Sequence, residues 1–140
     1  MERVEQKTEN DCMVACLAML LDIRYEEIVK WFELKHRDWH LVSDVVVTLI
    51  EHGYGICFLD ASGIGRWGGV RRFVGTLEQR KPSLPSGDAQ RFGHAFVIDE
   101  NENVHDPSPK TPTSFDMGTL FGRLAGLGLT VEWVAKIVAV

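Results

Sequence analysis

Residues 6–21 read QKTENDCMVACLAMLL, a polar segment that passes directly into an apolar one. From Asp11 to about Leu21 the residues favour a helix and are apolar on almost every side. This pattern predicts a buried central helix with Asp11 as its N-cap. Cys12 stands at the start of that helix, where unpaired N–H groups and a partial positive charge are exposed. A cysteine held there can shift toward the thiolate, which is its reactive form.

Two further helices and five strands are expected after this segment. Amphipathic patterns predict helices at residues 25–32 and from Ser43 onward, the second ended by Gly53. Apolar runs bounded by turn residues predict strands at 54–59, 70–77, 92–99, 104–106 and 131–138. Loops rich in glycine or proline are expected at 61–69, 81–88 and 124–129. Because helices precede strands, we expect an α+β fold with N-terminal helices packed on an antiparallel sheet.

The overall composition bounds the class of protein. The chain has 45% hydrophobic and 25% charged residues, which argues against disorder and for a single domain over residues 1–140. Its formal net charge of −5 disfavours nucleic acid as the main partner. The arginines between Arg66 and Arg80 are too few to change this, and we interpret them as a solvated strand face.

The sequence favours a reducing compartment without a membrane partner. The first ten residues are polar and lack the apolar core of a secretory signal. The apolar run 14–21 is far shorter than the roughly 20 residues that span a bilayer. The three cysteines show no paired spacing, which argues against a disulfide framework. We therefore expect a cytoplasmic protein.

Cys12 is the candidate nucleophile. Free cysteines usually pack as small hydrophobic residues, and this alternative is preferred for Cys16, one helical turn later, and for Cys57, in an apolar strand. Cys12 differs because it follows polar residues at a helix start. The helix dipole contributes only about 0.3–1 kcal/mol there, less than the roughly 1.4 kcal/mol of one pKa unit. A reactive Cys12 therefore also needs an imidazolium partner.

His94 is the candidate partner among five histidines. It opens the strand AFVID after a glycine, so its ring can project from the end of the sheet. Asp106, at hairpin distance on the next strand, can accept the N–H of one ring nitrogen and leave the other facing the thiol. His105 precedes Asp106 directly, so strand alternation directs it to the opposite face. The alternatives are a structural His94 and an Asp106 that only makes a turn with Pro107.

Gln6 completes the candidate site. Attack of a thiolate on a carbonyl develops an oxyanion that needs preorganised donors. The backbone N–H of Cys12 and the side-chain amide of Gln6 are candidates for this role. Neither a nucleotide-binding motif nor a zinc-ligand spacing occurs, so no cofactor and no metal is predicted. A metal site of Cys12, Cys16 and His94 is a disfavoured alternative.

Together these segments resemble the papain-like cysteine peptidases, and most closely the bacteriocin-processing (double-glycine leader) peptidases in a stand-alone form. The shared pattern is a Gln, a polar spacer, Asp-Cys with an Ala-Cys-Leu-Ala-Met helix, then a His-Ala-aliphatic strand and Asp-Pro. Here it is carried by Gln6, Asp11–Cys12, residues 15–19, His94–Val97 and Asp106–Pro107.

The resemblance implies a papain-like α+β fold and a cysteine peptidase or isopeptidase acting on a peptide or protein substrate. By the same resemblance Cys12 is the nucleophile, His94 the general base and acid, Asp106 the orienting residue and Gln6 part of the oxyanion hole. One departure is Met13, where the family usually has glycine after the nucleophile. Met13 motivates an alternative from another class: a weak or inactive peptidase-fold module that sequesters or inhibits a partner protein.

Two further questions stay open at this level. An acyltransferase or deamidase would use the same triad with a different acceptor or substrate nitrogen. Trp39, Trp67 and Phe92 are candidates for lining a substrate cleft, with packing in the core or between loops as the preferred alternative. The sequence indicates neither a particular substrate nor an oligomeric state.

Overall fold

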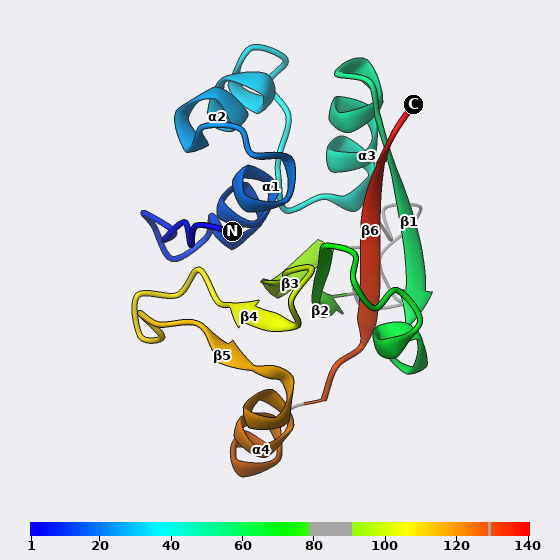
Figure 1. Ribbon diagram of the computed structural model, residues 1–140. Helices are drawn as coiled ribbons and strands as arrows, with labels where there is room; N and C mark the ends of the chain where they lie inside the picture. Colours follow the sequence, from blue (N-terminus) through cyan, green and yellow to red (C-terminus); the bar gives the residue numbers. More distant parts are fainter. Residues whose placement is uncertain (79–90, 129) are drawn as a thin grey trace, which may run out of the picture.

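The computed structural model describes residues 1–78, 91–128 and 130–140 (Figure 1). The predicted loop 81–88 lies outside these ranges. In chain order the elements are α1 (Cys12–Leu21), α2 (Tyr25–Glu33), α3 (Val42–Glu51), β1 (Tyr54–Asp60), the 3-10 helix η1 (Ala61–Gly65), β2 (Arg72–Glu78), β3 (Arg91–Ile98), β4 (Asn103–His105), β5 (Phe115–Asp116), α4 (Met117–Leu127) and β6 (Trp133–Ala139).

The fold is α+β, as predicted. The strands form one six-stranded antiparallel sheet in the order β1-β6-β2-β3-β4-β5. The C-terminal strand β6 lies between β1 and β2, so β1 and β5 are the two open edges. Helices α1, α2 and α3 lie on one side of the strands in Figure 1, and α4 lies at the opposite end of the molecule.

Helix α1 is the centre of the larger core. Every residue from Cys12 to Met19 is buried, which confirms the prediction from its all-round apolar sequence. The helix packs on β3 and ends where Asp22 adopts a left-handed conformation, with φ of 54°. The helices predicted at 25–32 and from Ser43 are also confirmed as α2 and α3.

The sheet separates two apolar clusters. The first joins helices α1, α2 and α3 to one sheet face through inward side chains such as Phe73, Phe92 and Val97. The second lies on the other face, where Leu120 of α4 packs with Phe96 and Val104. Both sheet faces thus carry apolar residues, which explains why the strands read as nearly continuous apolar runs.

Two expectations about this second face are wrong. Residues 124–127, predicted as loop because of their glycines, continue helix α4, which ends at Gly128 in the left-handed conformation. Burial of Leu120 and Leu124 against the sheet outweighs the low helix propensity of the glycines. Cys57, predicted as a core residue, is exposed. It lies on the edge strand β1, whereas α4 packs on β4 and β5 near the other edge.

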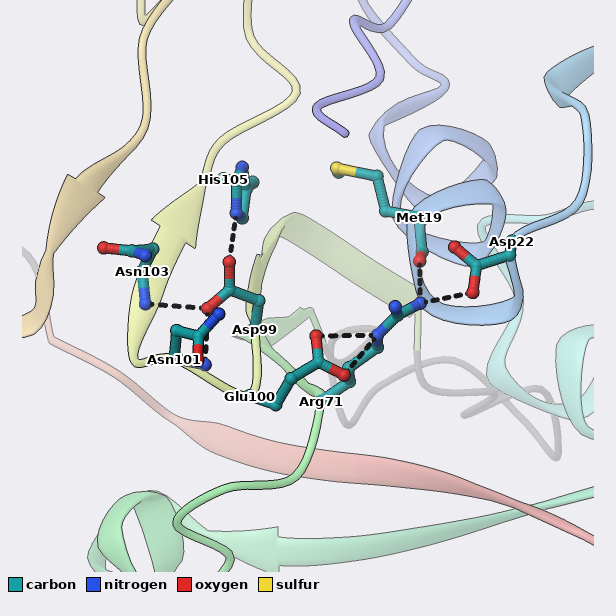
Figure 2. A network of polar contacts seen from close by, with 8 residues as sticks. All are labelled: Met19, Asp22, Arg71, Asp99, Glu100, Asn101, Asn103 and His105. Carbon is teal, nitrogen blue, oxygen red and sulfur yellow. Dashed lines mark hydrogen bonds and ion pairs between the residues drawn. The ribbon is translucent and has the colours of Figure 1, made fainter. Parts of the chain in front are cut away.

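The arginine cluster is only partly a solvated face. Arg72 is fully buried; it donates to the carbonyl of Ile64 at 2.6 Å and pairs with Glu102. Arg71 connects the sheet to the end of α1, since it bonds the carbonyl of Met19 at 3.1 Å and pairs with Asp22 and Glu100 (Figure 2). These arginines therefore hold the helices and the sheet together.

Among the described residues, no helix is long and apolar enough to cross a membrane.

Candidate functional site

A β-bulge in β3 sets the position of His94. The pairs Gly75↔Ala95 and Leu77↔Phe92 leave one residue between them on β2 but two, Gly93 and His94, on β3. The extra residue lets Phe92 and Ala95 both face the core cluster beneath the helices, although they are three positions apart. A bulge re-aims the side chain that it carries. The side chain of His94 is 48% exposed, whereas every residue from Ala95 to Ile98 is buried.

Gly75 makes this bulge possible. A Cβ at position 75 would lie 2.1 Å from the carbonyl oxygen of His94 and 3.0 Å from the Cα of Ala95. Both neighbours are backbone atoms, so no side-chain rotation can relieve the clash. The sequence did not identify Gly75 as a site residue, but a glycine inside a predicted strand is a recognised signal of a bulge or close backbone approach.

His94 and Asp106 form a hydrogen-bonded pair, as predicted. The Nε2 atom of His94 lies 2.9 Å from Oδ1 of Asp106, which leaves Nδ1 on the other side of the ring. Hydrogen bonds to Asp106 and to Cys12 raise the pKa of His94 to about 10. The ring is therefore an imidazolium at neutral pH, held between a carboxylate and a thiol.

Cys12, the first residue of α1, contacts the strand that carries His94. Its Sγ lies 3.6 Å from the carbonyl oxygen of Gly93, the residue before His94, and its exposed fraction is 8%. Cys16 is buried on the same helix, and burial raises the pKa of its thiol well above the usual value, with smaller contributions from Cys12 and Asp106. Cys16 is therefore an unreactive core residue, as the sequence predicted.

Asp11 precedes α1 but does not cap it. The residue occupies the N-cap position without a side-chain cap bond, so the expected capping interaction is wrong. Its buried carboxylate instead accepts hydrogen bonds from the amides of Lys7 and Thr8, at 3.1 and 2.9 Å. The N–H groups of the first turn of α1 thus keep their positive potential free of a side-chain cap.

Gln6 lies beside Asp106 through the backbone. Its N–H donates to the carbonyl of Pro107 at 2.8 Å, and the Asp11 turn leads from it to Cys12. Its side-chain Nε2 donates to the carbonyl of Thr8 at 2.8 Å, which engages one of the two amide hydrogens. Its Oε1 is buried without a hydrogen-bond partner among the described residues.

Hydrogen bonds therefore connect the segments that carry the four predicted residues. Gln6 bonds Pro107, the neighbour of Asp106, and Asp106 bonds His94. Cys12 bonds Gly93, the neighbour of His94, and Asp11 bonds the turn that follows Gln6. Arg3 also holds the segment that carries Asp106, and the sequence analysis did not identify it as a site residue. It donates to the carbonyls of Asp106 and Ser108 at 2.8 and 2.7 Å. No local signal could identify it, since more than a hundred positions separate the partners.

The other histidines have separate roles. His105 is buried and its Nε2 lies 2.8 Å from Oδ2 of Asp99, in the network of Figure 2. Its ring therefore bonds Asp99 and is not part of the pair formed by His94 and Asp106. His40 pairs with Asp38 at 2.9 Å, and the exposed His52 stacks on Trp31 with ring centroids 3.8 Å apart.

The aromatic residues considered for a cleft mainly pack. Phe92 is buried among Phe58, Phe73 and Trp133. Trp67 packs against the cluster beneath α4. Trp39 packs against the helical core, and its Nε1 donates to the carbonyl of Asn10 at 2.9 Å, close to the start of α1.

A cavity of about 240 Å³ borders the pair of His94 and Asp106. It lies beneath α4, on the sheet face opposite α1. Its apolar wall includes Phe96, Phe115, Leu120, Leu124 and Val131, and its polar wall includes Thr111, Arg123 and Thr130. The sequence did not predict this cavity because α4 was expected to be partly loop.

Met13 does not face the site. Its side chain is 1% exposed and belongs to the core cluster beneath the helices. Met13 is therefore a core residue and presents no exposed side chain at the site.

Within the described ranges, no group of three or more His, Cys, Asp or Glu side chains is arranged to hold a metal ion. No known family model matches the chain, and no curated protein shows a significant match to it. The resemblance drawn from the motifs thus stays a prediction.

Proposed function

We propose that this protein is a papain-like thiol hydrolase that cleaves a peptide or isopeptide bond. In this proposal Cys12 is the nucleophile, His94 is the general base and acid, and Asp106 orients His94. The observation that carries the proposal is the position of His94, bonded to Asp106 at 2.9 Å, with the Sγ of Cys12 3.6 Å from the carbonyl oxygen of the preceding residue, Gly93. A nucleophile, a base and an orienting carboxylate in this order are what acyl transfer requires.

The first step is attack of the Cys12 thiolate on the substrate carbonyl. A C–S bond forms, the carbonyl electrons move to oxygen, and the tetrahedral intermediate carries an oxyanion. The uncapped N–H groups at the start of α1 are the nearest donors for that charge. The unused side-chain N–H of Gln6 is the second donor in this proposal.

The second step expels the leaving amine. The C–N bond breaks while the His94 imidazolium transfers its proton to nitrogen, which leaves a thioester on Cys12 and a neutral His94. Water then attacks the thioester and His94 accepts one of its protons; the C–S bond breaks, the carboxylic acid is released, and the Cys12 thiolate and the His94 imidazolium are restored. Asp106 keeps the ring in one orientation throughout, since its bond engages Nε2 and directs Nδ1 to sulfur.

The raised pKa of His94 supports its proposed role as general acid, because it keeps the ring positively charged at neutral pH. An imidazolium beside Cys12 favours the thiolate, whereas the helix dipole alone contributes too little. A general acid with pKa near 10 is fully protonated at neutral pH, ready to serve the leaving amine. Once the thiolate is consumed, one of the two contacts that hold this proton is lost, which eases its release.

A thiol-labelling experiment tests the proposal. The exposed Cys57 would react with any electrophile, so the protein carries Cys57→Ser, and iodoacetamide adducts are followed by intact mass from pH 5 to pH 10. We expect Cys12 to be alkylated at pH 6, where an ordinary thiol is almost entirely protonated. His94→Ala should lower that rate about tenfold or more. Equal rates in the two proteins at every pH would contradict the proposal.

Identification of reaction products distinguishes a hydrolase from an acyltransferase, a deamidase or a sequestering module. The Cys57→Ser protein is incubated with a panel of peptides and ubiquitin-like conjugates, and products are identified by mass. Cleavage that needs Cys12 supports a hydrolase, whereas transfer to an added amine or a one-dalton amide-to-acid change indicates an acyltransferase or deamidase. Tight partner binding without turnover, together with unreactive Cys12, would support the sequestering module instead.

A further inference from the structure

The cavity beneath α4 shares its wall with the proposed general acid. His94 and Asp106 form one part of the wall, while the apolar remainder comes from β3, β5, α4 and residue Val131. Among the described residues that line it, none belongs to α1 or to the segment before it. The cavity is therefore on the His94 side of the thiol and not on the Cys12 side.

This placement distinguishes the two halves of a substrate. During acyl transfer the acyl half stays bonded to Cys12, whereas the leaving half departs on the nitrogen that His94 protonates. Groups attached to that nitrogen must therefore lie next to the ring of His94. A cavity with His94 in its wall is positioned for the leaving half.

We propose that this cavity is a specificity site for an apolar side chain on the residue that follows the scissile bond. The inference rests on the proposed function and deepens it by naming a substrate class. A volume of about 240 Å³ accommodates one apolar side chain of leucine size. Phe96 and Leu120 are buried beneath it, so the floor of the site is formed by the core itself.

The polar wall favours an amino-acid residue over a plain hydrocarbon chain. The Arg123 guanidinium is held over the ring of Phe115 at 4.2 Å from its centroid, which fixes a donor group beside the apolar surface. Thr111 and Thr130 also border the cavity. An apolar floor with donors at its rim matches a residue whose side chain is apolar and whose main chain offers carbonyl acceptors.

Acyl-transfer partitioning tests this site directly. A small acyl thioester loads Cys12 of the Cys57→Ser protein, and either leucinamide or glycinamide is added as acceptor. By microscopic reversibility the acceptor amine occupies the leaving-group site. Mass spectrometry then gives the ratio of amide product to hydrolysis product. We expect leucinamide to be captured about tenfold to hundredfold better, the factor that burial of a leucine side chain supports.

Two variants of α4 make the test specific. Leu124→Trp fills the cavity and should abolish the preference for leucinamide over glycinamide. Phe121→Trp is the matched control, since Phe121 is 51% exposed on the same helix and does not line the cavity. Equal capture of the two amines, or a preference that survives Leu124→Trp, would overturn the inference.

The result also separates the two proposals. Formation of an acyl-enzyme without a leucinamide preference refutes the specificity site and leaves the hydrolase standing. Failure to form an acyl-enzyme refutes the hydrolase, and the cavity is then examined in Cys12→Ala by nuclear magnetic resonance. Shifts at the amides of Phe96 and Leu124 with leucinamide but not glycinamide would support an apolar amine site. Their absence would refute it.

Discussion

The carbonyl oxygen of His94 lies directly against Gly75, so that a Cβ at position 75 would approach it to 2.1 Å. The contact joins the two neighbouring strands β2 and β3 at the bulge that carries His94. The proposed base therefore depends on the absence of a side chain on the adjacent strand.

Gly75→Ala should displace the bulge. Because the clash is with backbone, we expect a loss of about 1–3 kcal/mol in the free energy of unfolding. We also expect the pKa of His94, followed by nuclear magnetic resonance, to fall from about 10 toward its ordinary value as the contacts to Asp106 and Cys12 loosen. Gly122→Ala is the control, since no atom lies within 4 Å of the added Cβ. A purely structural role for Gly75 would lower stability without moving the titration of His94.

Asp106→Asn should lower the pKa of His94. The variant keeps an oxygen acceptor but removes the carboxylate, whose hydrogen bond to His94 is the first cause of the raised pKa and whose negative charge raises it further. We expect the pKa to fall by about one to three units, the usual effect of a neighbouring opposite charge.

The raised pKa of His94 also determines how the stability of the fold changes with pH. The charged His94 contributes stability that is fully present below its unfolded pKa and is lost as pH rises through about 10. The alkaline loss of stability should therefore be smaller in Asp106→Asn than in the wild type when urea unfolding is compared at pH 7 and pH 10. An unchanged difference between these pH values would show that the pair does not couple to folding.

Asp11→Ala should loosen the turn between Gln6 and Cys12. The buried carboxylate holds two backbone amides, and hydrogen bonds to a charged group contribute about 1.5–3 kcal/mol. We expect a loss of that order in urea unfolding and faster hydrogen exchange at the amides of Lys7 and Thr8. Asp11→Asn retains an acceptor and should lose less. Equal losses in both variants would indicate that charge, not the acceptor oxygen, is what the turn requires.

Asp99→Asn should reduce the sensitivity of the fold to acid. Burial acts to raise the pKa of Asp99, but hydrogen bonds from His105 and from the amides of Asn103 and Asn101 outweigh it and hold the pKa below its usual value. The stability that it contributes is present above the unfolded pKa of about 3.9 and is lost as pH falls through the lower folded pKa. Unfolding at pH 7 and pH 3 should therefore differ less in the variant. Glu2→Gln, which removes an exposed carboxylate, is a control.

Much of the fold is readable in the sequence because local patterns and burial agree there. The helix 12–21 is apolar on every side, and the strands near 54–60, 72–78 and 91–98 are apolar runs between turn residues. Helix α4 escaped prediction because its glycines weaken local propensity, while its stability comes from packing on the sheet. Arg72 was misread as solvated because its partners, Ile64 and Glu102, come from other segments.

In the candidate site, too, the sequence determined one part and the tertiary structure another. The sequence alone determined which residues have the required chemistry: a cysteine at a helix start, a histidine in a strand, an aspartate in the following hairpin and a glutamine upstream. It placed His94 at the start of its strand, whereas the structure places it within β3, at the bulge. Only the tertiary structure decided that His94 bonds Asp106, that Cys12 meets Gly93, and that Gly75 leaves room for the bulge. The reason is physical: residue type and helix or strand periodicity are local properties, whereas these contacts depend on strand register and close packing between segments far apart in the chain.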